Sequence, residues 1–156
     1  MVGTKAEHAG IIKVGAQLVS AVSCSKVPHI SIILGASYGA GNYAMCGRSY
    51  KPRFLFTWPI GKCSVMGPDQ LAGVMEQIET AKKGPQKLSP EVIQQRTERF
   101  KSQVQRDAES YSTSSIVVDD GIIDPRDTRD VLGMCLEVVQ SAPNDAMDGH
   151  KFLARI

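Results

Sequence analysis

Apolar residues occur along this chain in short groups that predict alternating helices and strands. Over residues 9–24 they recur at helical spacing, at Ile12, Ala16, Val19 and Val22. Pro28 ends that pattern, and the isoleucine-rich run at residues 29–34 predicts a strand buried on both faces. Three further apolar runs, at residues 53–58, 62–66 and 115–118, predict additional strands.

Proline and capping residues predict where the later helices begin. Pro68 suits the first position of a helix, whose apolar face would carry Leu71, Val74, Met75 and Ile78. Residues 82–87 are predicted to form a loop, after which Ser89 caps a long polar helix reaching about residue 109. Asp124, followed by Pro125, predicts a last helix that ends near Pro143, with Arg129 helping to order its start.

Strands that alternate with helices predict an α/β layered fold, and the chain shows no internal repeat. Its net charge of +2 gives no electrostatic reason to expect a nucleic acid or an anionic membrane as partner. The four cysteines have no zinc-site spacing, so we expect no metal and reduced thiols in an intracellular protein. We expect no membrane span, since no apolar run is long enough, and no targeting segment within the chain.

The segment GASYGAG at residues 35–41 carries most of the candidate chemistry. Gly35, Ser37 and Gly39 match the nucleophile elbow of an α/β-hydrolase, with Asp119, Asp120 or Asp124 and His150 as partners. Against this hypothesis, only about 28 residues precede the strand, which leaves little chain for an earlier oxyanion loop.

Two other functions are open to the same segment, besides a plain packing turn. Gly39, Gly41 and Ala44 fit a dinucleotide-binding pattern, but residues 55–68 lack the acidic residue that would hold the ribose. Alternatively, the turn is an oxyanion hole made of backbone N–H groups at a helix start, which needs small residues and no catalytic side chain. From the residues alone, the oxyanion hole and the packing turn remain equally open.

Longer motifs resemble a known family. The runs SYGAGNYAMCGRSYKPRFLFTWP and SVMG, within residues 10–67, and the later DDGIIDPRDTRDVLG are similar to the carboxyltransferase β subunits of biotin-dependent acyl-CoA carboxylases. The most similar branch is the methylcrotonoyl-CoA carboxylases. The resemblance extends from about residue 2 to residue 143 and is weakest along the long polar helix.

The resemblance implies a crotonase-like (ClpP/crotonase) α/β fold. Residues 1–156 would form a single partial domain, the C-terminal part of the biotin-side carboxyltransferase domain. The whole enzyme would move a carboxyl group from carboxybiotin, carried by an α subunit, to an acyl-CoA, with six β subunits at its core. It would lie in the mitochondrial matrix of a eukaryote or in the cytoplasm of a bacterium. This chain alone would be inactive.

The resemblance also implies roles for individual residues. Gly39, Ala40 and Gly41 correspond to the biotin-side oxyanion hole, in which the N–H groups of Ala40 and Gly41 hold the ureido oxygen. Tyr38, Asn42 and Tyr43 would flank the biotin, and Met66 and Gly67 would line the active-site wall.

Two positions bear on whether the chain can be catalytically competent, and two arginines are candidates for binding a phosphate. Pro68 and Val118 depart from the family pattern, and Pro68 removes an N–H near the expected site. Arg48 and Arg53 are candidates for binding a phosphate of CoA or of a partner, but surface or packing roles are favoured for both. The alternative function is a non-catalytic relic or assembly module with the same fold.

Overall fold

The computed structural model describes residues 3–81 and 89–141 of the chain. Its strands form two small parallel sheets, one with the order β1-β3-β5 and one with the order β2-β4. The strands are β1 (Ile30–Ile33), β2 (Ala36–Tyr38), β3 (Phe54–Thr57), β4 (Lys62–Ser64) and β5 (Gly121–Ile122). The helices are α1 (Thr4–His8), α2 (Ile11–Cys24), α3 (Gly39–Ala44), α4 (Pro68–Ala81), α5 (Pro90–Asp107), α6 (Ser110–Ser115) and α7 (Thr128–Ser141), with 3-10 turns at Arg48–Tyr50 and Pro125–Asp127.

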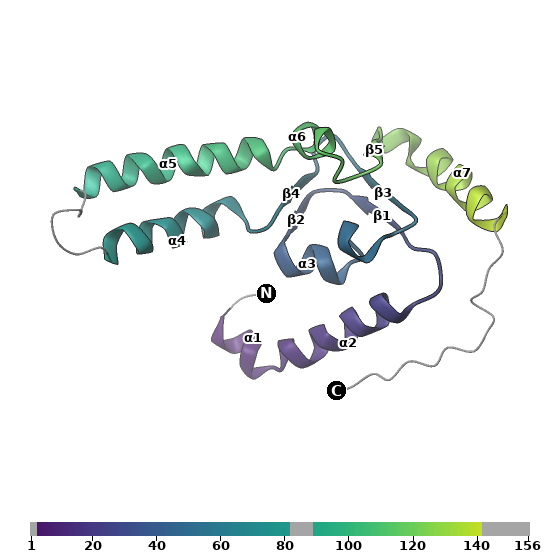
Figure 1. Ribbon diagram of the computed structural model, residues 1–156, viewed down its shortest axis with the longest axis horizontal. Coiled ribbons are helices and arrows are strands. Elements are labelled where there is room, and N and C mark those ends of the chain that lie inside the picture. Colours follow the sequence, from purple (N-terminus) through teal and green to yellow (C-terminus); the bar gives the residue numbers. More distant parts are fainter. Residues whose placement is uncertain (1–2, 82–88, 142–156) are drawn as a thin grey trace.

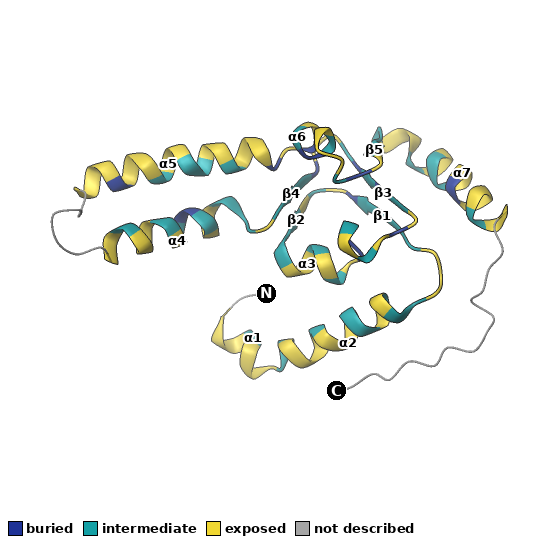
Figure 2. Ribbon diagram, in the orientation of Figure 1, coloured by how far each residue is buried: buried dark blue, intermediate teal, exposed yellow. Residues whose placement is uncertain are grey.

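The arrangement places α3 beside the strands, between them and α2, while α4 and α5 project together away from the sheets (Figure 1). Burial is concentrated at the strands, and the helices show mostly exposed surface (Figure 2). Leu55 and Thr57 on β3 are almost fully buried because β3 lies between β1 and β5. The structure therefore confirms mixed α/β layers, with a core centred on the middle strand. None of the helices in the described residues is long and apolar enough to cross a membrane.

Most of the predicted elements are present. Helix α2 and strands β1, β3 and β4 lie within the predicted ranges, and α4 begins at Pro68 as expected. The Ser89 hydroxyl accepts a hydrogen bond from the Val92 N–H and so caps α5. Asp124 caps the short 3-10 turn that leads into α7, and its ionic partner is Arg126. The predicted loop at 82–87 and the chain around Pro143 lie outside the described residues.

The predicted strand at residues 115–118 is wrong, because this region ends a helix. In α6 the Thr113 hydroxyl donates to the Glu109 and Ser110 carbonyls, and the Ser115 hydroxyl donates to the Ser112 carbonyl. These local bonds stabilise helical turns in a segment rich in hydroxyl side chains. Ile116 and Val117, which suggested a strand, are more than two-thirds exposed and pair with no strand in the described chain.

Candidate functional site

The glycine-rich segment joins a strand directly to a helix, since β2 ends at Tyr38 and α3 begins at Gly39. Gly39 has a φ of 55°, in the left-handed region that side-chain-bearing residues rarely adopt. A Cβ at Gly39 would also lie 2.9 Å from the Val65 carbonyl oxygen. Both the conformation and the close approach of the backbone therefore require glycine at this position.

The first turn of α3 presents backbone donors that the helix itself does not use. The first N–H groups of an α-helix have no carbonyl partner four residues earlier, and here they belong to Gly39, Ala40 and Gly41. Tyr38 precedes the helix and supplies no side-chain cap. Ala40 and Gly41 are exposed, and a Cβ on Gly41 would have no atom within 4 Å. Adjacent donors at an open turn suit an oxygen that gains negative charge.

The predicted wall residues lie beside this turn. Strands β2 and β4 are parallel, with Tyr38 opposite Ser64, so both strands end at the same edge. The chain then passes Val65, whose carbonyl backs Gly39, and reaches Met66 and Gly67. A Cβ on Gly67 would lie 3.5 Å from Cδ2 of the Tyr38 ring. The structure thus brings Tyr38, the turn and the segment after β4 together.

Two more predicted residues lie on α3 and differ in their surroundings. Tyr43 is 52% exposed, and its ring meets that of Tyr50 edge to face at 5.9 Å between centroids. Asn42 is half-buried, and its amide nitrogen donates to the Ser37 hydroxyl at 2.9 Å and to the Cys63 sulfur at 3.5 Å. Tyr43 is therefore accessible to a ligand, whereas the Asn42 amide is engaged within the chain.

The hydrolase hypothesis finds little support in this geometry. The Ser37 hydroxyl accepts a hydrogen bond from Asn42, which is not a base. Among the candidate acids, Asp120 pairs with Arg48 and Asp124 pairs with Arg126. The third candidate, Asp119, is buried within electrostatic range of Cys63, whose thiol pKa is raised by burial and by that carboxylate. His150 lies outside the described residues.

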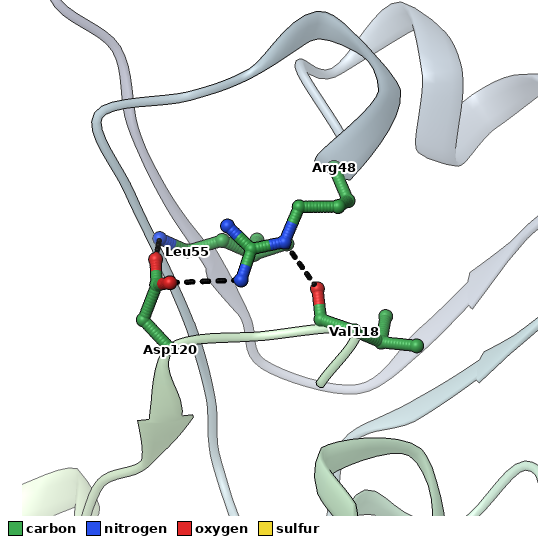
Figure 3. A network of polar contacts seen from close by, with 4 residues as sticks. All are labelled: Arg48, Leu55, Val118 and Asp120. Atoms are coloured by element: carbon green, nitrogen blue, oxygen red, sulfur yellow. Dashed lines mark hydrogen bonds and ion pairs between the residues drawn. The ribbon is translucent and has the colours of Figure 1, made fainter. Parts of the chain in front are cut away.

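Arg48 serves a structural role in this chain (Figure 3). Its guanidinium donates to the Val118 carbonyl at 3.1 Å and to the Asp120 carboxylate at 2.8 Å, and the same carboxylate accepts from the Leu55 N–H. Burial favours a higher pKa for Asp120, but the hydrogen bonds and charge of Arg48 and the Leu55 N–H outweigh it and lower the pKa. The contacts join the segment after α3 to β3 and to the loop before β5.

The remaining candidate cation, Arg53, lies over the Phe54 ring with 5.2 Å between guanidinium carbon and ring centroid. Within the described ranges, no group of three or more His, Cys, Asp or Glu residues is placed to hold a metal ion.

Val65 and Cys63 are the site neighbours that sequence reasoning missed. Val65 contributes a carbonyl, and Cys63 contributes a sulfur across a strand pair, so neither carries a recognisable local signal.

Comparison with known proteins identifies the family to which this chain belongs. Residues 1–151 match the family model described as the carboxyl transferase domain, and the chain belongs to that family. The chain is 50% identical over 147 residues to the mitochondrial methylcrotonoyl-CoA carboxylase beta chain of Arabidopsis thaliana, covering 92% of this chain and 25% of that protein.

Solved structures agree with the family assignment. The beta subunit of P. aeruginosa geranyl-CoA carboxylase matches with a TM-score of 0.83 and 32% identity, over 99% of this chain and 30% of that one. The transcarboxylase 12S structure, described as a hexamer assembly, matches with a TM-score of 0.75 and 26% identity, over 92% of this chain and 26% of that one. The predicted crotonase-like fold is thereby confirmed. The chain spans about a quarter of the length of the curated relatives it matches.

Proposed function

We propose that this chain is the biotin-side segment of a carboxyltransferase that moves a carboxyl group onto an acyl-CoA, with 3-methylcrotonoyl-CoA as the favoured substrate. The observation that carries the proposal is the turn at residues 39–41, where backbone donors with no partner inside the helix follow a glycine that the geometry requires. The name of the Arabidopsis relative supports the substrate, because that protein is a methylcrotonoyl-CoA carboxylase beta chain.

The residues present fit a bound biotin. The turn carries no side chain larger than a methyl group, its residues Ala40 and Gly41 are exposed, and its donors have no helix partner. Biotin, carried by a partner subunit, supplies the carboxyl group that is transferred. The N–H groups of Ala40 and Gly41 would bind its ureido oxygen and stabilise the negative charge that grows there. Tyr38 and Tyr43 would flank the ring system, and Met66 and Gly67 would form the adjacent wall.

The rest of the enzyme follows the same proposal. The acyl-CoA would be bound by parts of the protein beyond this chain, which spans only a quarter of its relatives. We propose a homo-oligomer with six copies, as described for transcarboxylase 12S, and a biotin-carrying α subunit as partner. A eukaryotic protein would lie in the mitochondrial matrix, in keeping with the name of the plant relative, and a bacterial one in the cytoplasm.

A Gly41→Val variant tests the oxyanion turn without disturbing the fold. A side chain at residue 41 meets open space rather than the chain, so the variant should assemble while it blocks the donors. We expect carboxyl transfer to fall by about 10²–10³-fold, the usual effect of losing an oxyanion donor. The measurement is carboxylation of methylcrotonoyl-CoA and propionyl-CoA by the full-length polypeptide with its biotin-carrying partner.

A matched control is Gly133→Val, which adds the same side chain to open space on α7, away from the turn. The control should keep full activity, because valine has at least the helix propensity of glycine and meets no neighbouring atom there. Equal activity in Gly41→Val and wild type would remove the oxyanion role from this turn. An assembled wild type that carboxylates neither substrate would instead favour the non-catalytic relic or assembly module.

A further inference from the structure

The Asn42 side chain joins three elements behind the turn. Its amide nitrogen donates to Ser37 on β2 at 2.9 Å and to Cys63 on β4 at 3.5 Å. Ser37 and Cys63 are register partners in the parallel sheet, so one carboxamide attaches α3 to both strands of that sheet. The three residues are half-buried, which shields these bonds partly from competition by water.

Gly47 packs directly against Asn42. The buried Gly47 N–H donates to the Asn42 carbonyl oxygen at 2.9 Å. A Cβ on Gly47 would overlap the Asn42 carboxamide oxygen and would lie 2.8 Å from the Asn42 carbonyl oxygen. Gly47 has an ordinary φ of −68°, so space rather than conformation requires glycine there. Asn42 is therefore held between the strands and Gly47.

This confinement matters because α3 has only six residues. A helix this short does not hold its shape or direction without tertiary contacts. The donors at residues 40 and 41 precede Asn42 in the same helix, so the orientation of α3 decides where they point. Errors well below 1 Å in donor placement reduce transition-state stabilisation, since catalytic groups must be held within about 0.5 Å.

We propose that Asn42 is a positioning residue, which fixes the turn at residues 39–41 by joining α3 to β2 and β4, and that it does not contact biotin. The inference rests on the proposed function of the turn. Asn42, which the sequence placed among the residues flanking biotin, would instead hold α3 in place from behind. Ser37 would contribute by accepting the hydrogen bond of the Asn42 amide. Tyr38 and Tyr43 remain the flanking side chains.

A double-mutant cycle in the full-length polypeptide with its biotin-carrying partner tests this role. The variants are Asn42→Ala, Ser37→Ala and the double variant. The forward assay gives kcat and KM for the acyl-CoA. The reverse assay, with free biotin as carboxyl acceptor, gives kcat and KM for biotin. We expect each single change to lower kcat by about tenfold, which corresponds to about 1.4 kcal/mol in the barrier. The double variant should be no slower than the slower single variant, and KM for free biotin should stay within about twofold.

Two further variants separate positioning from general loss of stability. Gly47→Ala deletes no side-chain hydrogen bond but displaces the Asn42 carboxamide, and it should lower kcat to a similar extent. Thr128→Val removes the 3.0 Å bond that Thr128 accepts from the Trp58 indole N–H, far from the turn, and should retain full kcat. Sedimentation of each variant establishes that only assembled protein is compared.

The outcomes distinguish this inference from the function on which it rests. An active wild type in which the Asn42 and Ser37 effects multiply, or in which Asn42→Ala raises KM for biotin while Ser37→Ala does nothing, overturns the positioning role alone. A wild type that assembles but transfers no carboxyl group overturns the proposed function and this inference together.

Discussion

The Arg48 guanidinium reaches from the segment after α3 to a loop 72 positions later in the chain. Its partner Asp120 has a pKa below the usual value in the folded protein, because the Arg48 and Leu55 hydrogen bonds outweigh the effect of burial. A carboxyl group whose pKa is lowered by folding stabilises the protein above the pKa of the unfolded chain, about 3.9. That contribution disappears as the pH falls through the folded pKa.

An Arg48→Gln substitution should therefore destabilise the protein in a pH-dependent manner. We expect a loss of about 1 kcal/mol near neutral pH, since both side chains are over a third exposed and water screens the pair. The loss should shrink in acid, as the pH falls below the lowered folded-state pKa of Asp120 and the carboxyl group is protonated with or without its partner. Urea unfolding of the assembled full-length variant and wild type at both pH values measures this difference.

Arg126→Gln is the matched control for this prediction. Arg126 also pairs with an aspartate, and its hydrogen bonds lower the pKa of Asp124 to about 2, but its side chain is 87% exposed. The same substitution there should have a much smaller effect on unfolding. A loss at Arg48 that is as large in acid as at neutral pH would mean that the Val118 contact, not the ion pair, carries the effect.

The individual residues show which interactions a sequence can predict. The turn at residues 39–41 was predictable because glycine and alanine at a strand-to-helix junction restrict the possible chemistry to a few types. The Arg48–Asp120 pair was not, because nothing in the local sequence links residues so far apart. The Asn42 contacts were likewise hidden, since their direction depends on how β2 and β4 pair.

At the scale of elements, proline and caps predicted the starts of α4 and α5, because both act within one turn of the chain. Periodicity failed where hydroxyl side chains compete with strand formation, as in α6. It also overstated burial, because Val74 and Ile78 on the predicted core face of α4 are exposed. Those positions lie on the projecting helical hairpin, where the described chain has no sheet to cover them (Figure 2).

The hairpin formed by α4 and α5 depends on a small internal contact. The two helices pack against each other, and each contributes one buried apolar residue, Ala72 or Ile93. Lys101 and Asp69 add an ion pair at 2.6 Å between the helices. We expect Ile93→Ala to cost about 2–4 kcal/mol locally, as for other buried aliphatic truncations.

Hydrogen exchange of the full-length protein measures this effect element by element. Ile93→Ala should speed exchange of the α4 and α5 amides and leave β1 and β3 unchanged, because the hairpin projects away from the sheets (Figure 1). Val92→Ala, at a neighbouring exposed position, is the control and should change little. Faster exchange throughout the sheet would show that the hairpin and the core unfold as one unit.

The whole molecule leaves much of its apolar surface uncovered. Within the described ranges, 18 large hydrophobic residues are exposed, and the buried hydrophobic set comprises seven residues. The outer edge of β1 also pairs with no described strand. Exposed apolar surface and an open strand edge both promote association.

Expressed alone, residues 1–156 should therefore self-associate. Analytical ultracentrifugation should show a broad distribution of large species, whereas the same residues within the full-length polypeptide should give one defined assembly. A fusion of the chain to soluble maltose-binding protein is a suitable comparison, because it separates poor expression from self-association of the chain. A monomer that unfolds cooperatively would contradict the expectation and show that the described core is sufficient by itself.

The order β1-β3-β5 has a consequence for synthesis on the ribosome. The α4–α5 hairpin joins neighbouring parts of the chain and can form as soon as it emerges, whereas β3 waits for β5, which is translated after both helices. Non-local pairing of this kind is slow and leaves strand edges exposed in the meantime. A ribosome that stalls before Gly121 would therefore hold a nascent chain with a finished turn at residues 39–41 and an unfinished sheet, which makes this stretch a natural point for chaperone capture.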